Sequence, residues 1–299
     1  MARKYLKVAT HSDLATEPHL TSALYALRKL VMTIPGYGDL YSIDGGMDQL
    51  PRRLVQGLTC TDVQLNAPVA RLTSHPDGSY SVHVRRGRTL TEARADAVVI
   101  ALPHNALHTI EWAGEPLRRR MASHIAAYDR PGHYLRISLL FDSPFWRSRV
   151  TGSWFMLDAF GGCCVYDEGG RHNLGDYGVL GWLLAGADAL AQCNADNETL
   201  IDRALESLPD DFYEEARIRL IEGKVHRWAG AVSGLPGGFP IRAARRSHQP
   251  DIAGQGLFVV GDYLFESTLN GVLRSAGIAT DLLEEWLRAT PERDALCAR

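Results

Sequence analysis

The sequence predicts a mixed α/β or α+β fold in which a second domain is interleaved with the first. Three observations support this. Residues 97–102, AVVIAL, form a continuous apolar run that is typical of a buried strand, whereas residues 79–96 alternate apolar and polar side chains around a turn at Gly87. Residues 197–208 have helical periodicity, and strands and helices follow one another without strict alternation. A chain of 299 residues can form one large domain or two.

Turn residues and periodicity define the expected elements in order. Pro35 ends the first helical pattern and Pro103 ends the apolar strand, because proline lacks the N–H that either element needs. Asp196 or Asn197 is expected to cap the helix that follows it. Strands are expected at residues 63–72, on either side of Gly87, and at 97–102, 134–141, 178–186, 217–223 and 257–260. Helices are expected at 19–34, within 42–58, and at 104–126, 197–208 and 270–286.

Composition excludes several classes of protein. The net charge of −3 gives no general attraction to nucleic acid or to an anionic membrane. The five cysteines lack CxxC spacing, which indicates reduced thiols, and no apolar run is long enough to span a bilayer. The N-terminus lacks the apolar core of a signal peptide, so we expect a cytoplasmic protein. His104, His108 and Glu111 share a helical spacing, but without a further histidine the sequence favours no metal site.

Nucleotide-binding motifs are missing from the sequence. Neither G-x-G-x-x-G nor G-x-x-x-x-G-K-[ST] occurs, so no self-contained first βαβ dinucleotide unit is visible. Residues 257–286 nevertheless combine a short apolar strand, a Gly-Asp at its end, a polar loop and an amphipathic helix. The carboxyl end of a strand and the amino end of a helix are where nucleotide-sized ligands often bind.

Several sequence blocks carry a resemblance to the flavin-containing amine oxidase family, which includes monoamine, polyamine and amino-acid oxidases. The blocks, in order, are DLYSIDGGMDQLPRRL, VQLNAPVARL, ADAVVIALPHNAL, LRISLLFDSPFW, HRW and LFVVGDYLFESTLNGVLRSAGIAT. The resemblance runs from about residue 36 to 288 and covers only the later half of the family pattern. The family's N-terminal fingerprint has no counterpart in this sequence.

The resemblance implies a two-domain flavoprotein of the glutathione-reductase type. A partial FAD-binding Rossmann-like domain would be interleaved with a mixed-sheet substrate domain. The implied segments are residues 1–38 for a helical part of the substrate domain, 39–103 and 236–290 for the FAD domain, 104–235 for the substrate domain, and 291–299 for a tail.

The resemblance also implies a set of flavin-contacting residues. They are Gly45, Gly46, Val69, Pro103, Trp228, Gly261, Asp262, Asn270, Gly271 and Val272. Several of them have a plainer interpretation. Gly45 and Gly46 could form an ordinary turn, Val69 could be a core strand residue, and Pro103 could only terminate a strand.

The last block has a physical reason for its implied role. The Asp262 carboxylate can accept hydrogen bonds from ribityl or ribose hydroxyls. Free backbone N–H groups at Asn270, Gly271 and Val272 would face the flavin ring, where negative charge develops on reduction. Gly271 would allow close approach of the ring. The alternative is an ordinary strand–loop–helix in which Asn270 is the cap.

The implied catalytic residues depart from the family pattern. Arg136 stands where the family often has a lysine near flavin N5, and arginine keeps the charge but has a different reach. Phe239 stands near the first aromatic position of the family's substrate cage, and Thr268 stands near the second, where it is not aromatic. Trp228 would line the substrate and flavin pocket. With no cysteine at a tethering position, the FAD should be non-covalent.

These residues predict a flavin-dependent oxidoreductase, or one chain of it, that takes a hydride from a small-molecule substrate. An amine or amino acid is the expected substrate, and a C–C desaturase-like activity is the alternative. The missing fingerprint predicts either that a second polypeptide carries the G-x-G-x-x-G unit or that the chain is a fragment. A homo-oligomer is the alternative expectation for the partner. A non-catalytic interaction or assembly module is the hypothesis from another class.

Overall fold

The computed structural model describes residues 2–24, 27, 43–171, 174–233, 248–250, 256–264 and 267–289. The chain divides into two compact units, each built from two stretches of sequence. Unit 1 comprises Met1–Asp62 and Gly132–Gly230, and unit 2 comprises Val63–Pro131 and Ala231–Arg299. Residues 43–62 therefore group with unit 1 and residues 104–131 with unit 2. The assignment of segments to a flavin domain and a substrate domain stays a prediction.

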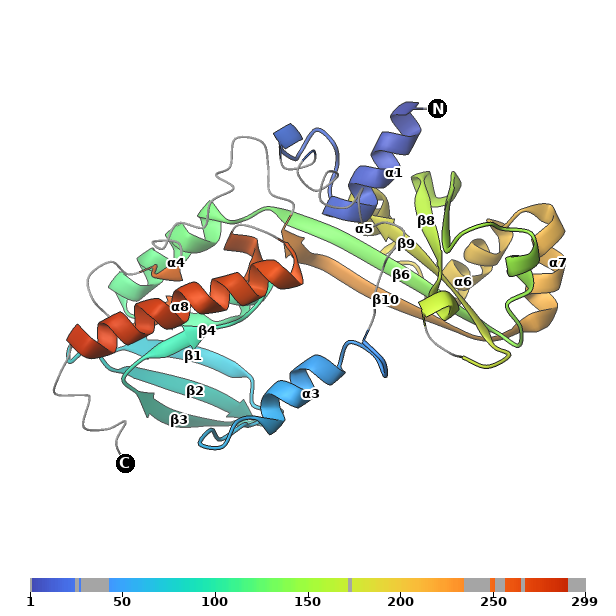
Figure 1. The fold of residues 1–299 in the computed structure, drawn as a ribbon. Helices are drawn as coiled ribbons and strands as arrows, with labels where there is room; N and C mark the ends of the chain where they lie inside the picture. The colour runs from blue at the N-terminus through green and yellow to red at the C-terminus, as the bar shows by residue number, and fades with distance from the viewer. Residues whose placement is uncertain are drawn as a thin grey trace. The chain divides into compact units, whose positions relative to one another are not determined.

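Unit 1 contains a five-stranded sheet in the order β10-β6-β9-β8-β7 (Figure 1). Its strands are β6 (Pro131–Phe141), β7 (Trp154–Leu157), β8 (Cys163–Asp167), β9 (Gly178–Ala185) and β10 (Leu220–Ser233). Strands β6 and β8 each pair antiparallel with β9, and β7 pairs antiparallel with β8. Leu135, Ile137 and Leu139 of β6 are fully buried, whereas Arg136 and Ser138 between them are half-buried. The sheet therefore has one core face and one more open face.

Two helices cover the core face of this sheet. Helices α6 (Asn197–Glu206) and α7 (Asp210–Arg219) contribute Leu200, Ala204 and Phe212 to the core that includes Trp182 of β9. As predicted, Asp196 caps α6, where its side chain accepts a hydrogen bond of 2.8 Å from the Thr199 amide. The described part of unit 1 also contains α1 (Ala2–Leu14), α3 (Gln49–Gln56), α5 (Gly186–Gln192), η3 (Phe145–Ser148), η4 (Ala159–Gly161) and η5 (Glu168–Arg171).

Helix α1 lies against β8 and β9 of unit 1. Ser12 fixes this contact, because its hydroxyl lies 2.8 Å from the Tyr166 hydroxyl and its carbonyl accepts a 2.7 Å hydrogen bond from Tyr134. Tyr134 lies two residues before Arg136 on β6, so α1 covers part of the more open face of the sheet.

The described residues of unit 2 form two sheets. A four-stranded sheet has the order β3-β2-β1-β5, and a two-stranded parallel sheet joins β11 to β4. The strands are β1 (Val69–Ser74), β2 (Tyr80–Arg86), β3 (Thr89–Ala95), β4 (Val98–Ile100), β5 (Glu111–Ala113) and β11 (Leu257–Val259). The helices are η2 (His104–Thr109), α4 (Glu115–Ala127), η7 (Asp262–Leu264) and α8 (Leu269–Ala289). Helix α8 contacts β11, the strand that pairs with β4. Within the described residues, no helix has both the length and the apolar character that crossing a membrane requires.

Several predicted elements differ from the structure. The strand expected at 63–72 begins only at Val69, and residues 19–22 of the helix expected at 19–34 are not helical. The helix expected at 104–126 is wrong, because Trp112 lies on β5, which pairs parallel with β1, and Gly114 at φ 94° precedes the real helix, α4. The strand expected at 217–223 begins only at Leu220, because α7 continues to Arg219. In the predicted helix 19–34, residues 25–26 and 28–34 lie outside the described residues.

Candidate functional site

The strand–turn–helix of residues 257–289 is present in unit 2 as the sequence predicts. Strand β11 is fully buried, and its carboxyl end is held by a 2.8 Å hydrogen bond from the Val260 amide to the Ile100 carbonyl of β4. Gly261 and Asp262 follow directly, and α8 begins at Leu269. Ligands of parallel sheets bind beyond the carboxyl ends of the strands, and this is where Asp262 lies.

Asp262 is half-buried, and its carboxyl group lies in the turn that follows β11. Burial raises the pKa of Asp262, while the backbone amides of Tyr263 and of Asp262 itself act in the opposite direction. A carboxylate that is partly removed from water gains from hydroxyl donors that a ligand brings. The ribityl and ribose chains of a flavin dinucleotide carry such hydroxyls, so Asp262 fits this part of FAD.

The start of α8 differs from the prediction in one respect. Thr268 caps the helix: its hydroxyl oxygen accepts a 3.0 Å hydrogen bond from the Gly271 amide, and its carbonyl accepts one of 3.0 Å from the Val272 amide. The predicted free N–H groups at Gly271 and Val272 are therefore already bonded. The cap is Thr268 and not Asn270. Thr268, expected near an aromatic cage position, has this structural role.

The beginning of α8 exposes apolar side chains. Leu269, Val272 and Leu273 are 49%, 38% and 55% exposed and follow a helical spacing. Asn270 is exposed beside them, whereas Gly271 is buried. An apolar helix end beside Asp262 is chemically suited to the flat face of a ring system.

A cleft of about 310 Å³ in unit 2 brings Val69 and the end of β4 together. Because the consecutive residues Val98–Leu102 all line it, while side chains of a strand alternate between faces, the cleft follows the edge of β4. The other lining residues are Leu72, Val82, Ile110 and Trp112, so the lining is apolar throughout. Pro103 lies just beyond, where it ends the extended segment and precedes η2.

In unit 1, Arg136 points from β6 onto the more open face of the sheet. Its guanidinium forms an ion pair with Glu168, and their side chains are 29% and 25% exposed. Gly181 of β9 makes room for the pair, because a Cβ there would lie 2.9 Å from an Arg136 nitrogen. Tyr166 lies on the same face, with its ring centroid 6.0 Å from the Arg136 guanidinium. The positive charge predicted at this position is thus matched by a negative one.

Trp228 of β10 lies on the same face of the sheet as Arg136. Gly223 packs closely against Leu139 of the core face, so the even-numbered residues of β10 point the other way. Trp228 is 42% exposed, and its ring stacks on that of His226 at 5.8 Å.

The register of β10 against β6 places His226 near Arg136. The Asp142 amide bonds to the Arg219 carbonyl at 3.1 Å, and the Gly230 amide bonds to the His133 ring at 3.0 Å. These contacts make the strands antiparallel and place Arg136 opposite residues 225–227. Neither Glu168 nor His226 is among the residues predicted from the sequence. Alternation along β10 could have indicated His226, but no local signal indicates Glu168, which joins the site through the fold.

The other predicted residues lie elsewhere. Gly45 and Gly46 form a turn ahead of α3 in unit 1, with φ of 81° and 96°, values that favour glycine. The Gly46 amide donates to the Ile43 carbonyl at 2.9 Å, which suits the plain-turn interpretation. Phe239 lies outside the described residues.

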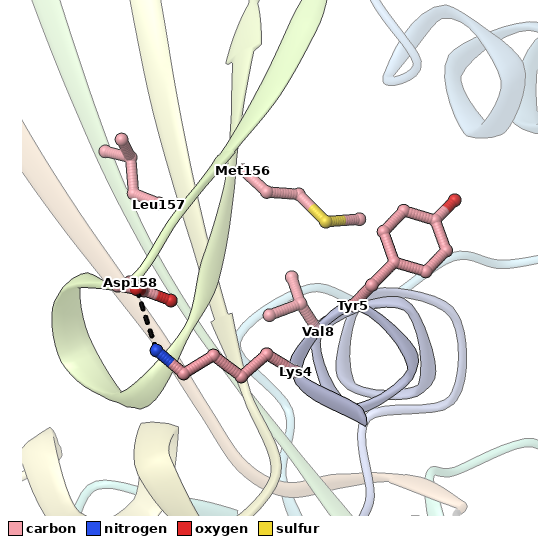
Figure 2. Close-up of a pocket in the computed structure, with 6 residues that line it drawn as sticks. All are labelled: Lys4, Tyr5, Val8, Met156, Leu157 and Asp158. Atoms are coloured by element: carbon pink, nitrogen blue, oxygen red, sulfur yellow. Dashed lines mark hydrogen bonds and ion pairs between the residues drawn. The ribbon is translucent and has the colours of Figure 1, made fainter. Parts of the chain in front are cut away.

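A larger cavity in unit 1 lies between α1 and β7 (Figure 2). It has a volume of about 590 Å³ and is lined by Lys4, Tyr5, Val8, Met156, Leu157 and Asp158. Its two charged groups pair with one another, since Lys4 Nζ lies 2.9 Å from the Asp158 carboxylate, and both are mostly exposed. None of the predicted site residues lines this cavity. We therefore interpret it as an ordinary surface cleft.

Comparisons with known proteins agree with the resemblance. The family model described as flavin containing amine oxidoreductase matches residues 8–283. Cyclohexylamine oxidase from Brevibacterium oxydans IH-35A has a similar structure, with a TM-score of 0.69 and 19% identity over 94% of this chain. A putrescine oxidase bound to putrescine gives a TM-score of 0.64 and 18% identity over 95% of this chain. The chain spans 64% of the length of each of these two structures. No curated protein sequence matches it significantly.

Proposed function

The chain belongs to the flavin-containing amine oxidoreductase family, and we propose that it forms all or part of a flavin-dependent enzyme that oxidises an amine or amino acid. The observation that carries this proposal is Asp262, a half-buried carboxylate at the carboxyl end of β11 and just ahead of α8. Acceptance of a hydride at N5 is the chemistry that a bound flavin supplies.

Unit 2 would hold the flavin through its own side chains. Asp262 would accept hydrogen bonds from the sugar-alcohol hydroxyls, and the apolar start of α8 at Leu269 and Val272 would offer a surface for the ring. The apolar cleft at Val69 has the size and lining for a flat base such as adenine. The binding would be non-covalent, since residues 256–289 contain no cysteine.

Unit 1 would supply the substrate side. Arg136, paired with Glu168, and Trp228, stacked on His226, present polar and aromatic groups on one sheet face. Oxidation of a neutral amine needs no strong base, so these groups would act by positioning the substrate and excluding water. An activated C–C bond is the alternative site of hydride loss.

The pyrophosphate-binding unit would come from outside residues 1–299, and a second polypeptide is one source of it. The sequence contains no G-x-G-x-x-G, and a dinucleotide needs backbone N–H groups of this kind for its phosphates. The apolar edge of β4 supports this idea, because Val99 and Leu102 are 46% and 37% exposed beside the cleft. The same exposure supports a second candidate function, a non-catalytic assembly module that uses this edge to bind another protein.

The visible spectrum distinguishes the two candidates. The chain should be purified alone and together with the product of its neighbouring gene, each with added FAD. A flavin spectrum that substrate amines bleach, in either sample, is the expected result for the enzyme. Two colourless samples would contradict it and favour the assembly module.

Asp262→Ala tests the placement of the flavin. Loss of hydrogen bonds to a charged group should weaken FAD binding by about 10- to 100-fold. Asp281→Ala, which removes an exposed carboxylate from α8, is the matched control and should bind FAD like the wild type. If the Asp262→Ala protein keeps its colour and its reduction by amines, the proposed contact is wrong.

A further inference from the structure

Helix α8 packs on β11 through a narrow stripe of small residues. Gly271, Ser275 and Ala279 are buried and recur every fourth residue, which allows a close approach of helix and strand. Further along, the Trp286 ring packs edge-on against Phe258 with 6.5 Å between ring centroids. This stripe fixes how far the start of α8 lies from the end of β11.

Ser275 is the polar member of the stripe and is fully buried. Its hydroxyl oxygen accepts a 3.0 Å hydrogen bond from the Gly261 amide, immediately before Asp262. The same oxygen lies 2.9 Å from Nε2 of His248, which is also fully buried. A buried hydroxyl with two such contacts holds the turn, the helix and His248 at one point.

Tyr263 forms a second bridge on the other side of Asp262. Its hydroxyl lies 3.1 Å from Nε2 of His124 on α4, and both side chains are buried. Burial lowers the pKa of His124 to about 4, with His104 and His248 contributing, and burial raises the pKa of Tyr263. Near neutral pH the pair is therefore uncharged, and it holds the tyrosine by a neutral hydrogen bond.

We propose that Ser275 with His248, and Tyr263 with His124, are positioning residues that hold Asp262 for the hydroxyls of a flavin. The residues before and after Asp262 are each tied to a buried histidine through a hydroxyl group. This inference rests on the proposed function and goes beyond it, since none of these four side chains contacts the flavin in that proposal. A carboxylate fixed from both sides loses little conformational freedom on binding.

Titration with two different flavins distinguishes a positioning role of these residues from a general effect on stability. FAD carries the hydroxyls that Asp262 would bind, whereas lumiflavin keeps the ring and lacks them. The full chain, with its partner if FAD binding requires one, should be titrated with each compound. Ser275→Ala should weaken FAD binding about tenfold, because the Gly261 amide loses its acceptor, and should leave lumiflavin binding unchanged.

Tyr263→Phe gives an independent test that keeps the buried ring. It should weaken FAD binding about fivefold, again with no effect on lumiflavin. Thr280→Ala is the control on the same helix, since its exposed hydroxyl donates to the Ala276 carbonyl of that helix. It should bind both compounds like the wild type.

The outcomes are distinct. If Ser275→Ala and Tyr263→Phe bind FAD as tightly as the wild type, or lose FAD and lumiflavin equally, the positioning assignment is overturned while the proposed function stands. A wild-type chain that binds no flavin, alone or with its partner, overturns the proposed function and this assignment with it.

Discussion

The turn at Asp262 in unit 2 and the open sheet face at Arg136 in unit 1 are built by different interactions. The turn is held by buried, uncharged hydrogen bonds at Ser275 and Tyr263. The sheet face carries an ion pair between Arg136 and Glu168, whose side chains are about one quarter exposed. Buried neutral bonds are costly to break, whereas partly exposed ion pairs contribute little to stability.

Because of this difference, substitutions in the two regions should affect different properties of the protein. Changes around Asp262 should lower stability and ligand affinity together, because the same buried bonds serve both. Changes around Arg136 should alter which ligands bind and leave the fold intact, because the Leu135 side of the same strand carries the packing. Substitutions in the two regions test this contrast.

The largest effect on stability should come from lowering the pH, and it should act through His124 in unit 2. Its pKa is about 4 in the folded protein and about 6.5 when exposed, so the unfolded chain binds a proton first as the pH falls. Its contribution to stability is complete above pH 6.5 and is lost as the pH falls to about 4. The loss should be about 3 kcal/mol.

Urea unfolding at several pH values measures this loss. His124→Gln can keep a hydrogen bond to Tyr263 but cannot titrate. Between pH 6.5 and pH 4 the free energy of unfolding of the wild type should therefore fall by about 3 kcal/mol more than that of the variant. His19→Gln, at an exposed position, is the control and should leave the pH dependence unchanged. The prediction would be contradicted if the free energy of unfolding changed equally with pH in the wild type and in His124→Gln.

Two glycines, one in each region, should give the next largest contrast. A Cβ at Gly261 would overlap the ring of Tyr263, which is buried and tied to His124. The atoms nearest to a Cβ at Gly181 would be those of the Arg136 guanidinium and the Glu168 carboxylate, at the ends of side chains that can move. We expect Gly261→Ala to lower the free energy of unfolding by about 1–3 kcal/mol and Gly181→Ala by less than about 0.5 kcal/mol.

Parallel urea titrations of the two variants provide the measurement, and each serves as the control for the other. FAD binding should weaken in Gly261→Ala, because the turn before Asp262 must shift. If Gly181→Ala lowered the free energy of unfolding as much as Gly261→Ala, the ion-pair region would be as rigid as the turn. The proposed difference between the two regions would then be wrong.

The sequence predicted the region in unit 2 better than the region in unit 1, for a physical reason. Residues 257–286 are contiguous, and an apolar strand, a turn and an amphipathic helix are local signals. Even the Thr268 cap follows a local rule, since threonine before a helix favours that position.

The features that could not be predicted from the sequence depend on contacts between residues that are far apart in the chain. Glu168 reaches Arg136 from 32 residues away, beyond a neighbouring strand. Likewise, residues 104–126 have a helical pattern, but Trp112 joins a strand because β1 offers it a partner. His248 and Ser275, 27 residues apart, meet only through the packing of α8. Tertiary contacts of this kind override local propensity.

The smallest effect on stability should come from Glu168→Gln, which should have a clear effect on binding. Replacing the carboxylate leaves the Arg136 guanidinium without its negative partner, at a position that solvent reaches. The free energy of unfolding should change by less than about 1 kcal/mol. The sheet face should become more positive, so a carboxylate probe such as benzoate should bind roughly threefold more tightly.

Glu284→Gln is the matched control for this change, because it removes an exposed carboxylate 2.9 Å from Arg288 on α8 of unit 2. It should change neither stability nor benzoate binding. Tighter binding in Glu168→Gln alone, which weakens as salt is added, would assign the effect to the charge of Arg136. A loss of several kcal/mol would instead mean that the ion pair supports the fold as the buried bonds at Asp262 do, and the distinction between the two regions would fail.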